Sequence, residues 1–326
     1  MRRFCSILLC LALVLPFAAC RKTSVQEPDN TTKAFVIGFS QVGSESDWRI
    51  ANTKSMTETF QGDPQYEFRM ENARQQQENQ FASVRRFILE GVDLIVIAPT
   101  VEEGWQNVLT EVHDAGIPVI IMDRSVSVWD NNLYLTNVGS NFYGQGKKAV
   151  EWLSDETSGY DKVNILHLQG TLGATAQLQR TQALDDAVKE HGNWITNKLY
   201  GDFTEAKAYE VMTDYLATTQ DIDVLYSEND NMTFGAMRAF DEAGITYSEG
   251  GQVKIITFDA TKEALQYCLD GKIDICVECN PLFGPMVKEL IEKYRNGEDI
   301  KKHVYVEEQV FTSKDLDQAF IDAREY

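Results

Sequence analysis

The chain has 326 residues, of which 43% are hydrophobic and 25% are charged. This apolar share supports a packed core and excludes wholesale disorder, and the length favours two domains of about 150 residues each. The formal net charge is −20, from 50 acidic and 30 basic residues. Because so acidic a chain is repelled by phosphate backbones, nucleic-acid binding is disfavoured.

The first 33 residues have the features of an export signal followed by a tether. Arg2 and Arg3 precede a short apolar stretch, which ends in two alanines before Cys20. This order is typical of a bacterial lipoprotein signal peptide over residues 1–19, and the apolar run is too short for the alternative, an uncleaved membrane anchor. Cys20 would carry the lipid, and the polar residues 20–33 would form the tether. We expect a protein lipid-anchored on the periplasmic or extracytoplasmic face of a membrane.

Beyond the tether, predicted strands and helices alternate up to about residue 140. The run at 93–99 is almost entirely apolar, as parallel strands covered on both faces are, whereas Phe81, Val84 and Ile88 recur at helical spacing. The predicted strands are 34–41, 66–73, 93–99, 117–123 and 133–138, and the predicted helices are 48–60, 78–89 and 104–115.

The same alternation restarts in the second half of the chain. Because helices separate nearly every pair of strands, we predict parallel sheets with right-handed crossovers. The fold class is therefore α/β, with two doubly wound parallel-sheet lobes. The predicted strands are 162–169, 194–201, 223–228, 253–259, 272–278 and 303–311, and the predicted helices begin after Asn141 and cover 174–190, 204–216, 232–243, 285–295 and 313–324.

Several chemical motifs were considered and set aside. Cys276 and Cys279 form a C-x-x-C without a second ligand pair, so free core thiols or a Cys268–Cys276 disulfide are the simpler readings. The G-x-G-x-x-A at 144–149 lies inside a predicted helix rather than at a strand-to-helix turn. The four histidines have no metal-ligand spacing, and acidic pairs such as 307–308 read as solvated faces. We expect no metal and no cofactor.

Polar side chains cluster where the predicted strands end. Open α/β sheets bind ligands at the carboxyl ends of their strands. Carboxylate, amide and guanidinium groups there suit a ligand rich in hydroxyls, and an aromatic side chain suits the face of a sugar ring. A helix cap or a solvated loop charge remains the alternative for any single residue. The polar residues are Gln41, Asp123, Arg124, Asn229, Asp259, Glu278 and Asn280, and the nearby aromatic residues are Trp48, Trp105 and Phe203.

Over residues 34–326 these features resemble the bacterial periplasmic sugar-binding proteins of the ribose/galactose type, which are type I periplasmic binding proteins. The residues that carry the likeness include GSESDWR at 43–49, MDRS at 122–125, GDFT at 201–204 and ND at 229–230. The first and third of these motifs are most similar to the galactofuranose-binding branch of the family.

The resemblance implies two lobes that close on a sugar about three chain crossings. We place the crossings near 136–137, 279–281 and 310–312. The N-terminal lobe would then comprise 34–136 with 281–310, and the C-terminal lobe 137–280 with 311–326.

The resemblance also implies the residues that contact the ligand. Ala98 stands where the ribose-type branch has an amide, which argues against ribose, and Cys279 aligns with that branch's glutamine, so Glu278 or Asn280 would replace it. The implied ligand-binding residues are Gln41, Ser44, Trp48, Arg49, Asp123, Arg124, Arg180, Phe203, Asn229, Asp259, Glu278 and Asn280.

The resemblance implies the solute-binding lipoprotein of an ABC sugar importer, a monomer that delivers a galactofuranose-like or other pentose or hexose sugar to the permease subunits. The alternative from another class is a sensing module that presents a bound sugar to a membrane sensor kinase or chemoreceptor. An enzyme is disfavoured. A sugar hydrolase would need two carboxylates across the scissile bond, for which Asp123 and Asp259 are the conceivable pair.

Overall fold

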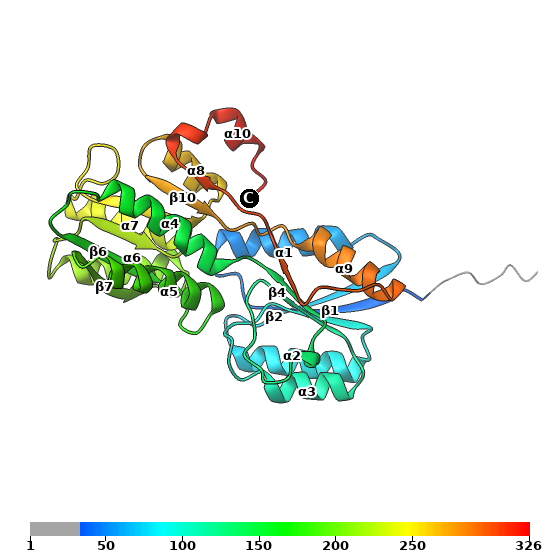
Figure 1. The fold of residues 1–326 in the computed structure, drawn as a ribbon. Helices are drawn as coiled ribbons and strands as arrows, with labels where there is room; N and C mark the ends of the chain where they lie inside the picture. The colour runs from blue at the N-terminus through cyan, green and yellow to red at the C-terminus, as the bar shows by residue number, and fades with distance from the viewer. Residues whose placement is uncertain (1–32) are drawn as a thin grey trace, which may run out of the picture. The chain divides into compact units, whose positions relative to one another are not determined.

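The computed structural model describes residues 33–326 (Figure 1). The predicted signal peptide, the lipidated Cys20 and the tether up to residue 32 lie outside the described residues. Within 33–326, no helix combines the length and the apolarity that crossing a membrane requires.

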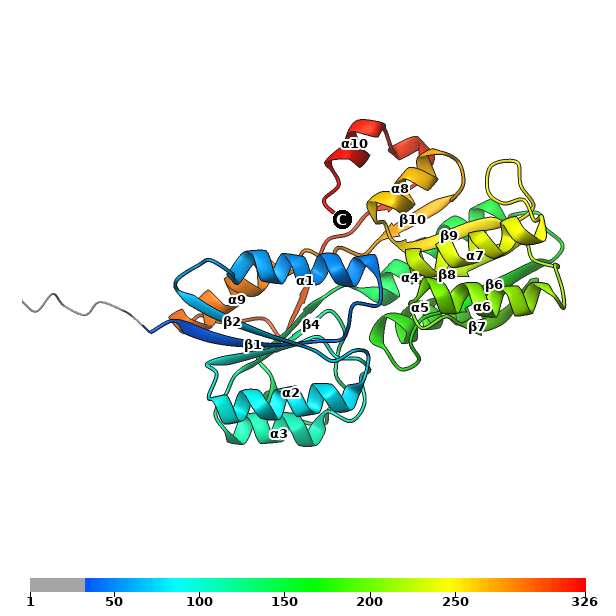
Figure 2. The ribbon, with the colours of Figure 1, turned by 180° about the vertical axis from the view of Figure 1, so that it is seen from behind.

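Six strands form the first sheet, in the order β11-β5-β4-β3-β1-β2, and every neighbouring pair is parallel. Helices α1 and α9 lie on one face of this sheet and α2 and α3 on the other (Figures 1 and 2). The strands are β1 (Phe35–Gln41), β2 (Tyr66–Asn72), β3 (Leu94–Ile97), β4 (Val119–Met122), β5 (Thr136–Gly139) and β11 (His303–Tyr305), and the helices are α1 (Asp47–Phe60), α2 (Gln77–Glu90), α3 (Gln106–Asp114) and α9 (Gly284–Asn296).

The second sheet also has six strands, in the order β12-β10-β9-β8-β6-β7. Its pairs are parallel except the edge strand β12, which runs antiparallel to β10. The strands are β6 (Val163–Gln169), β7 (Trp194–Tyr200), β8 (Val224–Ser227), β9 (Lys254–Asp259), β10 (Ile275–Glu278) and β12 (Val310–Phe311), and the helices are α4 (Phe142–Glu156), α5 (Thr175–Glu190), α6 (Glu205–Leu216), α7 (Asp230–Ala243), α8 (Lys262–Leu269) and α10 (Gln318–Ala323).

Both faces of the second sheet are covered, as strand β6 illustrates. All seven of its residues are buried, and alternate side chains enter different cores. Ile165 belongs to the cluster under α4 and α5, whereas Leu166 and Leu168 belong to the cluster that includes residues of α6 and α7. Because side chains alternate across a strand, this division requires apolar residues at every position. The predicted fold class, two doubly wound parallel-sheet lobes, is confirmed.

The first lobe contains the first sheet, and the second lobe contains the second sheet. The chain passes between the two lobes three times. The first crossing follows β5, which belongs to the first sheet up to Gly139, so the expected position at 136–137 falls inside that strand. The second crossing lies between β10 and α9, close to the expected 279–281. The third occupies 306–309, just before the expected 310–312.

Two predicted elements differ from the structure, and one helix of the structure is absent from the prediction. The single strand expected at 303–311 is two short strands in different sheets, because the third crossing interrupts it. The helix expected at 313–324 is divided into a 3-10 turn (Ser313–Asp315) and α10. Helix α8 was not predicted, because it has only eight residues; its side chains Ala264, Leu265 and Cys268 are buried, and the Thr261 hydroxyl caps its start.

Candidate functional site

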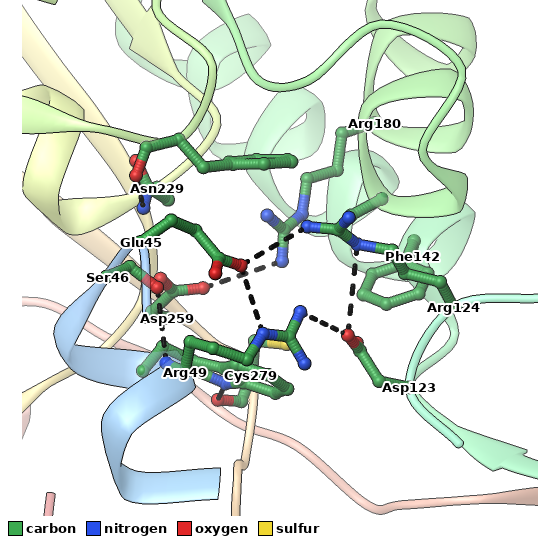
Figure 3. Close-up of a pocket in the computed structure, with 13 residues that line it drawn as sticks. Glu45, Ser46, Arg49, Asp123, Arg124, Phe142, Arg180, Asn229, Asp259 and Cys279 are labelled. Atoms are coloured by element: carbon green, nitrogen blue, oxygen red, sulfur yellow. Dashed lines mark hydrogen bonds and ion pairs between the residues drawn. The ribbon is translucent and has the colours of Figure 1, made fainter. Parts of the chain in front are cut away.

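The carboxyl ends of strands from both sheets border one pocket (Figure 3). The empty space between the residues that line it, counted together with its opening to solvent, is about 320 Å³. The first lobe supplies Glu45, Ser46, Trp48, Arg49, Asp123 and Arg124, the second lobe supplies Phe142, Ala176, Arg180, Phe203, Asn229 and Asp259, and Cys279 comes from the second crossing.

Four buried side chains of the first lobe, Glu45, Arg49, Asp123 and Arg124, form what we call the first-lobe ion cluster. Arg49 donates from Nε to Glu45 Oε1 (3.0 Å) and from Nη2 to Asp123 Oδ2 (2.6 Å). Arg124 lies between the same two carboxylates at 3.7 and 3.9 Å. The four side chains are only 2–4% exposed, so these pairs compensate one another away from water.

The first-lobe ion cluster shifts the pKa values of its members. Burial alone would lower the pKa of Arg49, but Asp123 and Glu45 outweigh burial and raise it. Burial would raise the pKa of Glu45, but Arg49 and Arg124 lower it overall. Burial, together with the charge of Arg49, lowers the pKa of Arg124 to about 10. The three groups therefore remain charged at neutral pH.

One acceptor of the first-lobe ion cluster has no partner within residues 33–326. Glu45 Oε2 is buried and receives no hydrogen bond from any described residue. Arg124 is better satisfied, since its Nη1 donates to Thr100 O (2.6 Å) and its guanidinium lies over the ring of Phe203 from the other lobe, 5.3 Å from the centroid. A ligand hydroxyl is the kind of donor that Glu45 Oε2 lacks.

In the second lobe, Arg180 is held mainly by uncharged groups. It donates from Nε and Nη2 to Gln145 Oε1 (3.0 and 2.8 Å) and from Nη1 to the main-chain oxygen of Glu228. Its guanidinium lies 5.3 Å from the ring centroid of Phe142 and 4.6 Å from that of Phe258. These contacts orient Arg180 without neutralising its charge.

Asp259, at the end of β9, is the acidic residue that the second lobe contributes to the pocket. The nearest cation is Arg180, whose Nη2 lies 3.8 Å from Asp259 Oδ1. Burial raises the pKa of Asp259 well above its ordinary value, and the neighbouring Asp230 adds to the effect. Asp230 accepts hydrogen bonds from Thr257 and Thr261 and is itself shifted by burial to a pKa of about 6.

Three residues of the pocket have left-handed backbone conformations that residues other than glycine rarely adopt. The φ angles are 65° at Asp123, 61° at Phe203 and 113° at Asp259. Such conformations are costly and gather at functional sites, where the surrounding structure enforces them. Phe203 also lies directly against Gly170, where a Cβ atom would collide with the aromatic ring. The backbone conformation of the loops after the strands therefore orients the side chains of Asp123, Phe203 and Asp259.

The pocket contains the aromatic residues Trp48, Phe142 and Phe203. Trp48 also joins α1 to the second crossing, since its Nε1 donates to Cys279 O (2.6 Å). Trp105, expected near the crevice, instead lies fully buried in the first-lobe core, where its indole N–H donates to Val101 O (2.9 Å).

Among the predicted ligand-binding residues, Trp48, Arg49, Asp123, Arg124, Arg180, Phe203, Asn229 and Asp259 line the pocket. Asn229 is also the N-cap of α7, which was the alternative reading: its Oδ1 accepts from Met232 N (3.0 Å) and its Nδ2 donates to Phe203 O (3.3 Å).

Two predicted residues of the first lobe lie behind or beside the pocket. Gln41 is buried, with its Oε1 3.4 Å from Arg49 Nη1 and its Nε2 donating to Asn52 Oδ1 (3.0 Å), so it supports Arg49 from behind. Ser44 is exposed and accepts a hydrogen bond from Asn72 Nδ2 (3.0 Å).

Glu278 and Asn280, expected to replace the ribose branch's glutamine, do not line the pocket either. Glu278 accepts from Gln309 N (2.9 Å) and forms an ion pair with Arg324 (2.8 Å). Asn280 Oδ1 accepts from Leu282 N (2.9 Å) and thereby shapes the second crossing.

The prediction missed Glu45, Ser46, Phe142, Ala176 and Cys279. Glu45 and Ser46 belong to the motif at 43–49, so their neighbourhood had been identified although their side chains had not. Phe142 and Ala176 begin helices that follow crossings or loops, and no strand end marked them. The three cysteines of the described chain are free and buried, and residues 33–326 contain no group of His, Cys, Asp or Glu that could hold a metal ion.

Comparison with known proteins identifies relatives along most of the chain. The galactofuranose-binding protein YtfQ of Escherichia coli (strain K12) is 36% identical over 263 residues, which cover 79% of this chain and 81% of that protein. The periplasmic binding protein component of the arabinose ABC transporter from Shewanella sp. ANA-3, bound to α- and β-L-arabinofuranose, is 36% identical. Its TM-score is 0.82, and the match covers 89% of this chain and 95% of the other.

A second solved structure, from Mycobacterium smegmatis in complex with β-D-fucofuranose, is also 36% identical, with a TM-score of 0.83 over 89% of this chain and 93% of the other. Residues 37–282 match the family model described as a periplasmic binding protein domain. This range runs from β1 through β10 and includes every residue that lines the pocket. The chain belongs to the periplasmic binding protein family.

Proposed function

We propose that this protein is the solute-binding component of an ABC sugar importer, which captures one neutral monosaccharide in the pocket and delivers it to the permease subunits. The observation that carries the proposal is the pocket itself, where three guanidinium groups and three carboxylates from two lobes surround a small space with aromatic walls. Such a set offers hydrogen bonds to hydroxyl groups and nearly balances in charge. The proposed mechanism is binding and closure, without a chemical step.

In this proposal each group of pocket residues contacts a different part of the sugar. Arg49 and Arg124 donate to ring or hydroxyl oxygens. Glu45 Oε2 accepts from a hydroxyl, since it is buried and no residue of the described part of the chain donates to it. From the other lobe, Arg180 and Asp259 contact the opposite edge of the sugar. The aromatic residues of the pocket supply apolar contact for the carbon face of the ring.

The ligand class we favour is a sugar in its five-membered furanose form. Three similar proteins are named for such ligands: YtfQ for galactofuranose, and the two solved structures for arabinofuranose and fucofuranose.

The described state corresponds to closed lobes. Asp47 and Asn231, from different lobes, form two hydrogen bonds (3.0 and 2.8 Å), and Ser125 N donates to Thr175 Oγ1 (2.7 Å) at another part of the rim. These bonds must break before a ligand can enter, so opening about the three crossings is part of the proposal.

Attachment to the membrane through Cys20, and a monomeric state, complete the proposal. Cys20→Ala should release the protein into the soluble fraction of cells, and mass spectrometry of the N-terminal peptide should detect an acylated cysteine. A soluble wild-type protein with an unmodified Cys20 would contradict the anchor.

Calorimetric titration of the protein tests the function directly, with D-galactose, L-arabinose, D-fucose, D-ribose and, as a charged control, D-galacturonate. We expect binding of at least one of the first three sugars and none of the galacturonate, because each arginine of the pocket already has a carboxylate within 4 Å. A bound sugar should also raise the melting temperature. No heat and no stabilisation with any of the sugars would overturn the proposal.

Uptake of the bound sugar by cells distinguishes the importer from the sensing alternative. Deletion of this gene should abolish uptake of that radiolabelled sugar. Normal uptake, combined with a lost transcriptional or chemotactic response to the sugar, would favour a sensing module.

A further inference from the structure

Glu308 lies where the three crossings meet. Its Oε1 accepts a hydrogen bond from Ser140 Oγ (2.6 Å), just after β5 in the first crossing, and another from the main-chain nitrogen of Asn280 (3.0 Å) in the second. Glu308 itself belongs to the third crossing. One carboxylate oxygen thus joins all three segments between the lobes.

The other oxygen of Glu308 leads toward the pocket. Glu308 Oε2 accepts from Gln145 Nε2 (2.6 Å), and the same nitrogen donates to Glu278 O (3.1 Å). Gln145 Oε1 in turn accepts hydrogen bonds from Nε and Nη2 of Arg180. Because a carboxylate only accepts, Glu308 fixes the Gln145 amide with its nitrogen toward the crossings and its oxygen toward Arg180.

Glu308 is half-buried. Burial raises its pKa, and the bonds from Ser140 and Gln145 oppose this rise. The other charged or titratable groups that face it are Arg180, the Cys279 thiol and Lys148, whose Nζ donates to the main-chain oxygen of Glu308 (2.6 Å).

The expectation that the acidic pair at 307–308 is a solvated face was therefore wrong for one of its members. Glu307 is exposed, whereas Glu308 points into the cluster between the crossings. Adjacent residues of an extended segment point to opposite sides, so the pair offers two acids of equal chemistry in different environments.

We infer that Glu308 is a positioning residue for ligand binding, which ties the three crossings together and, through Gln145, orients Arg180 toward the bound sugar. The inference rests on the proposed function, because the orientation of Arg180 matters for affinity only if the pocket holds a ligand. Nothing in this role requires Glu308 to touch the sugar.

The test compares Glu308→Gln with the matched control Glu307→Gln in the intact chain, with L-arabinose as the titrated sugar. The new amide at 308 has only one acceptor oxygen. It either places a donor against Gln145 Nε2, which can turn Gln145 so that it presents that donor to Arg180, or places the donor against Asn280 N in the second crossing. Each arrangement leaves one donor of this network without its acceptor, so we expect affinity to fall about tenfold or more. Glu307→Gln should bind L-arabinose as the wild type does.

A double variant separates positioning from mere support of the fold. In Glu308→Gln combined with Gln145→Glu, the carboxylate at 145 accepts from both Arg180 and the new amide. The direction of the relay is restored, and only the bond from position 145 to Glu278 O is lost. We expect the double variant to bind more tightly than Glu308→Gln alone. An affinity that falls only as far as thermal stability does, with no rescue in the double variant, would make Glu308 purely structural.

A second readout needs no sugar. The charge of Glu308 contributes, after burial, to the raised pKa of the Cys279 thiol, whose Sγ lies 3.4 Å from Ser140 Oγ. The pH profile of alkylation at Cys279, followed by peptide mass mapping, should move to lower pH in Glu308→Gln and stay in place in Glu307→Gln.

The outcomes are distinguishable. A wild type that binds none of the panel sugars refutes the proposed function, and the thiol profile then decides whether Glu308 acts at the crossings. An unshifted profile in Glu308→Gln, or wild-type affinity for L-arabinose in that variant, overturns the inference itself.

Discussion

In the first-lobe half of the pocket, two arginines and two carboxylates pair with one another, whereas in the second-lobe half Arg180 and Asp259 lie 3.8 Å apart and depend on uncharged groups. The difference appears in the pKa values. Glu45 has a lowered pKa because its cations outweigh burial, but the pKa of Asp259 is raised because burial outweighs its single distant cation.

This contrast shows two ways of holding charges ready for a ligand. The first-lobe ion cluster is organised by its own attraction, so removing one member leaves others buried without a partner. The second-lobe half is organised by main-chain carbonyls, Gln145 and the crossings, so its charges respond to changes in protonation. Mutation should therefore act mainly on the first half and pH mainly on the second.

The largest effect is expected for Arg49→Met. It leaves Glu45 and Asp123 as buried acids without their closest cation, which typically costs about 3–5 kcal/mol of unfolding free energy. Urea unfolding at neutral pH measures this cost, and sugar binding should be lost as well. A loss below about 1 kcal/mol would mean that Arg49 contributes little to the fold.

Arg124→Ala should affect binding far more than stability. Its ion pairs are longer, at 3.7 and 3.9 Å, so Arg49 still compensates both carboxylates when Arg124 is removed. We expect binding to become undetectable by calorimetry while unfolding free energy falls by about 1–2 kcal/mol, the cost of an unpaired buried carbonyl and lost packing. Destabilisation equal to that of Arg49→Met would instead make Arg124 structural.

The second-lobe half should respond to pH through Asp230 and Asp259. Their folded pKa values are raised, to about 6 for Asp230, so the folded state holds protons more tightly than the unfolded state. This contribution to stability is complete below about pH 4 and is lost as the pH rises through 6. Glu45, with its lowered pKa, contributes in the opposite direction, and its contribution is lost as the pH falls.

The variant Asp230→Asn tests how much Asp230 contributes to the pH dependence of stability. The stability of the variant relative to the wild type should improve as the pH rises from about 4 to 7, because the asparagine carries no proton to lose. Urea unfolding across this range gives the comparison. A difference between the two proteins that stays constant with pH would contradict the raised pKa.

The smallest effect is expected for Ser44→Ala, beside the first-lobe ion cluster in the same sequence motif. Ser44 is exposed and its hydroxyl contacts only Asn72 among the described residues, so we expect changes within about 0.5 kcal/mol in stability and unchanged affinity. A clear loss of affinity would show that the loop at 43–46 contacts the ligand more widely than its side chains in this state indicate.

Much of this architecture could be predicted from sequence because parallel strands leave a simple signature. Continuous apolar runs located strands such as β3, and the residues after them, including Asp123 and Asp259, then fell at the edge where ligands bind.

The missed features depend on contacts that no local pattern records. Glu278 ends β10 and turns toward Arg324, and the next residue, Cys279, faces the pocket, so a shift of one position reversed the side of the strand. The burial of Glu308 depends on Ser140 and Gln145, which are more than 160 residues away in the sequence.

Gly170 shows how a residue outside the pocket can limit what fits inside it. Because its missing side chain leaves room for the Phe203 ring, even a methyl group at 170 would collide with that ring and force it to move. The size of ligand that the pocket accepts thus depends partly on Gly170, which lies behind the Phe203 ring. Position 170 is therefore a place where the selectivity of the pocket can be retuned, by evolution or by an engineer, without replacing any polar residue of the site.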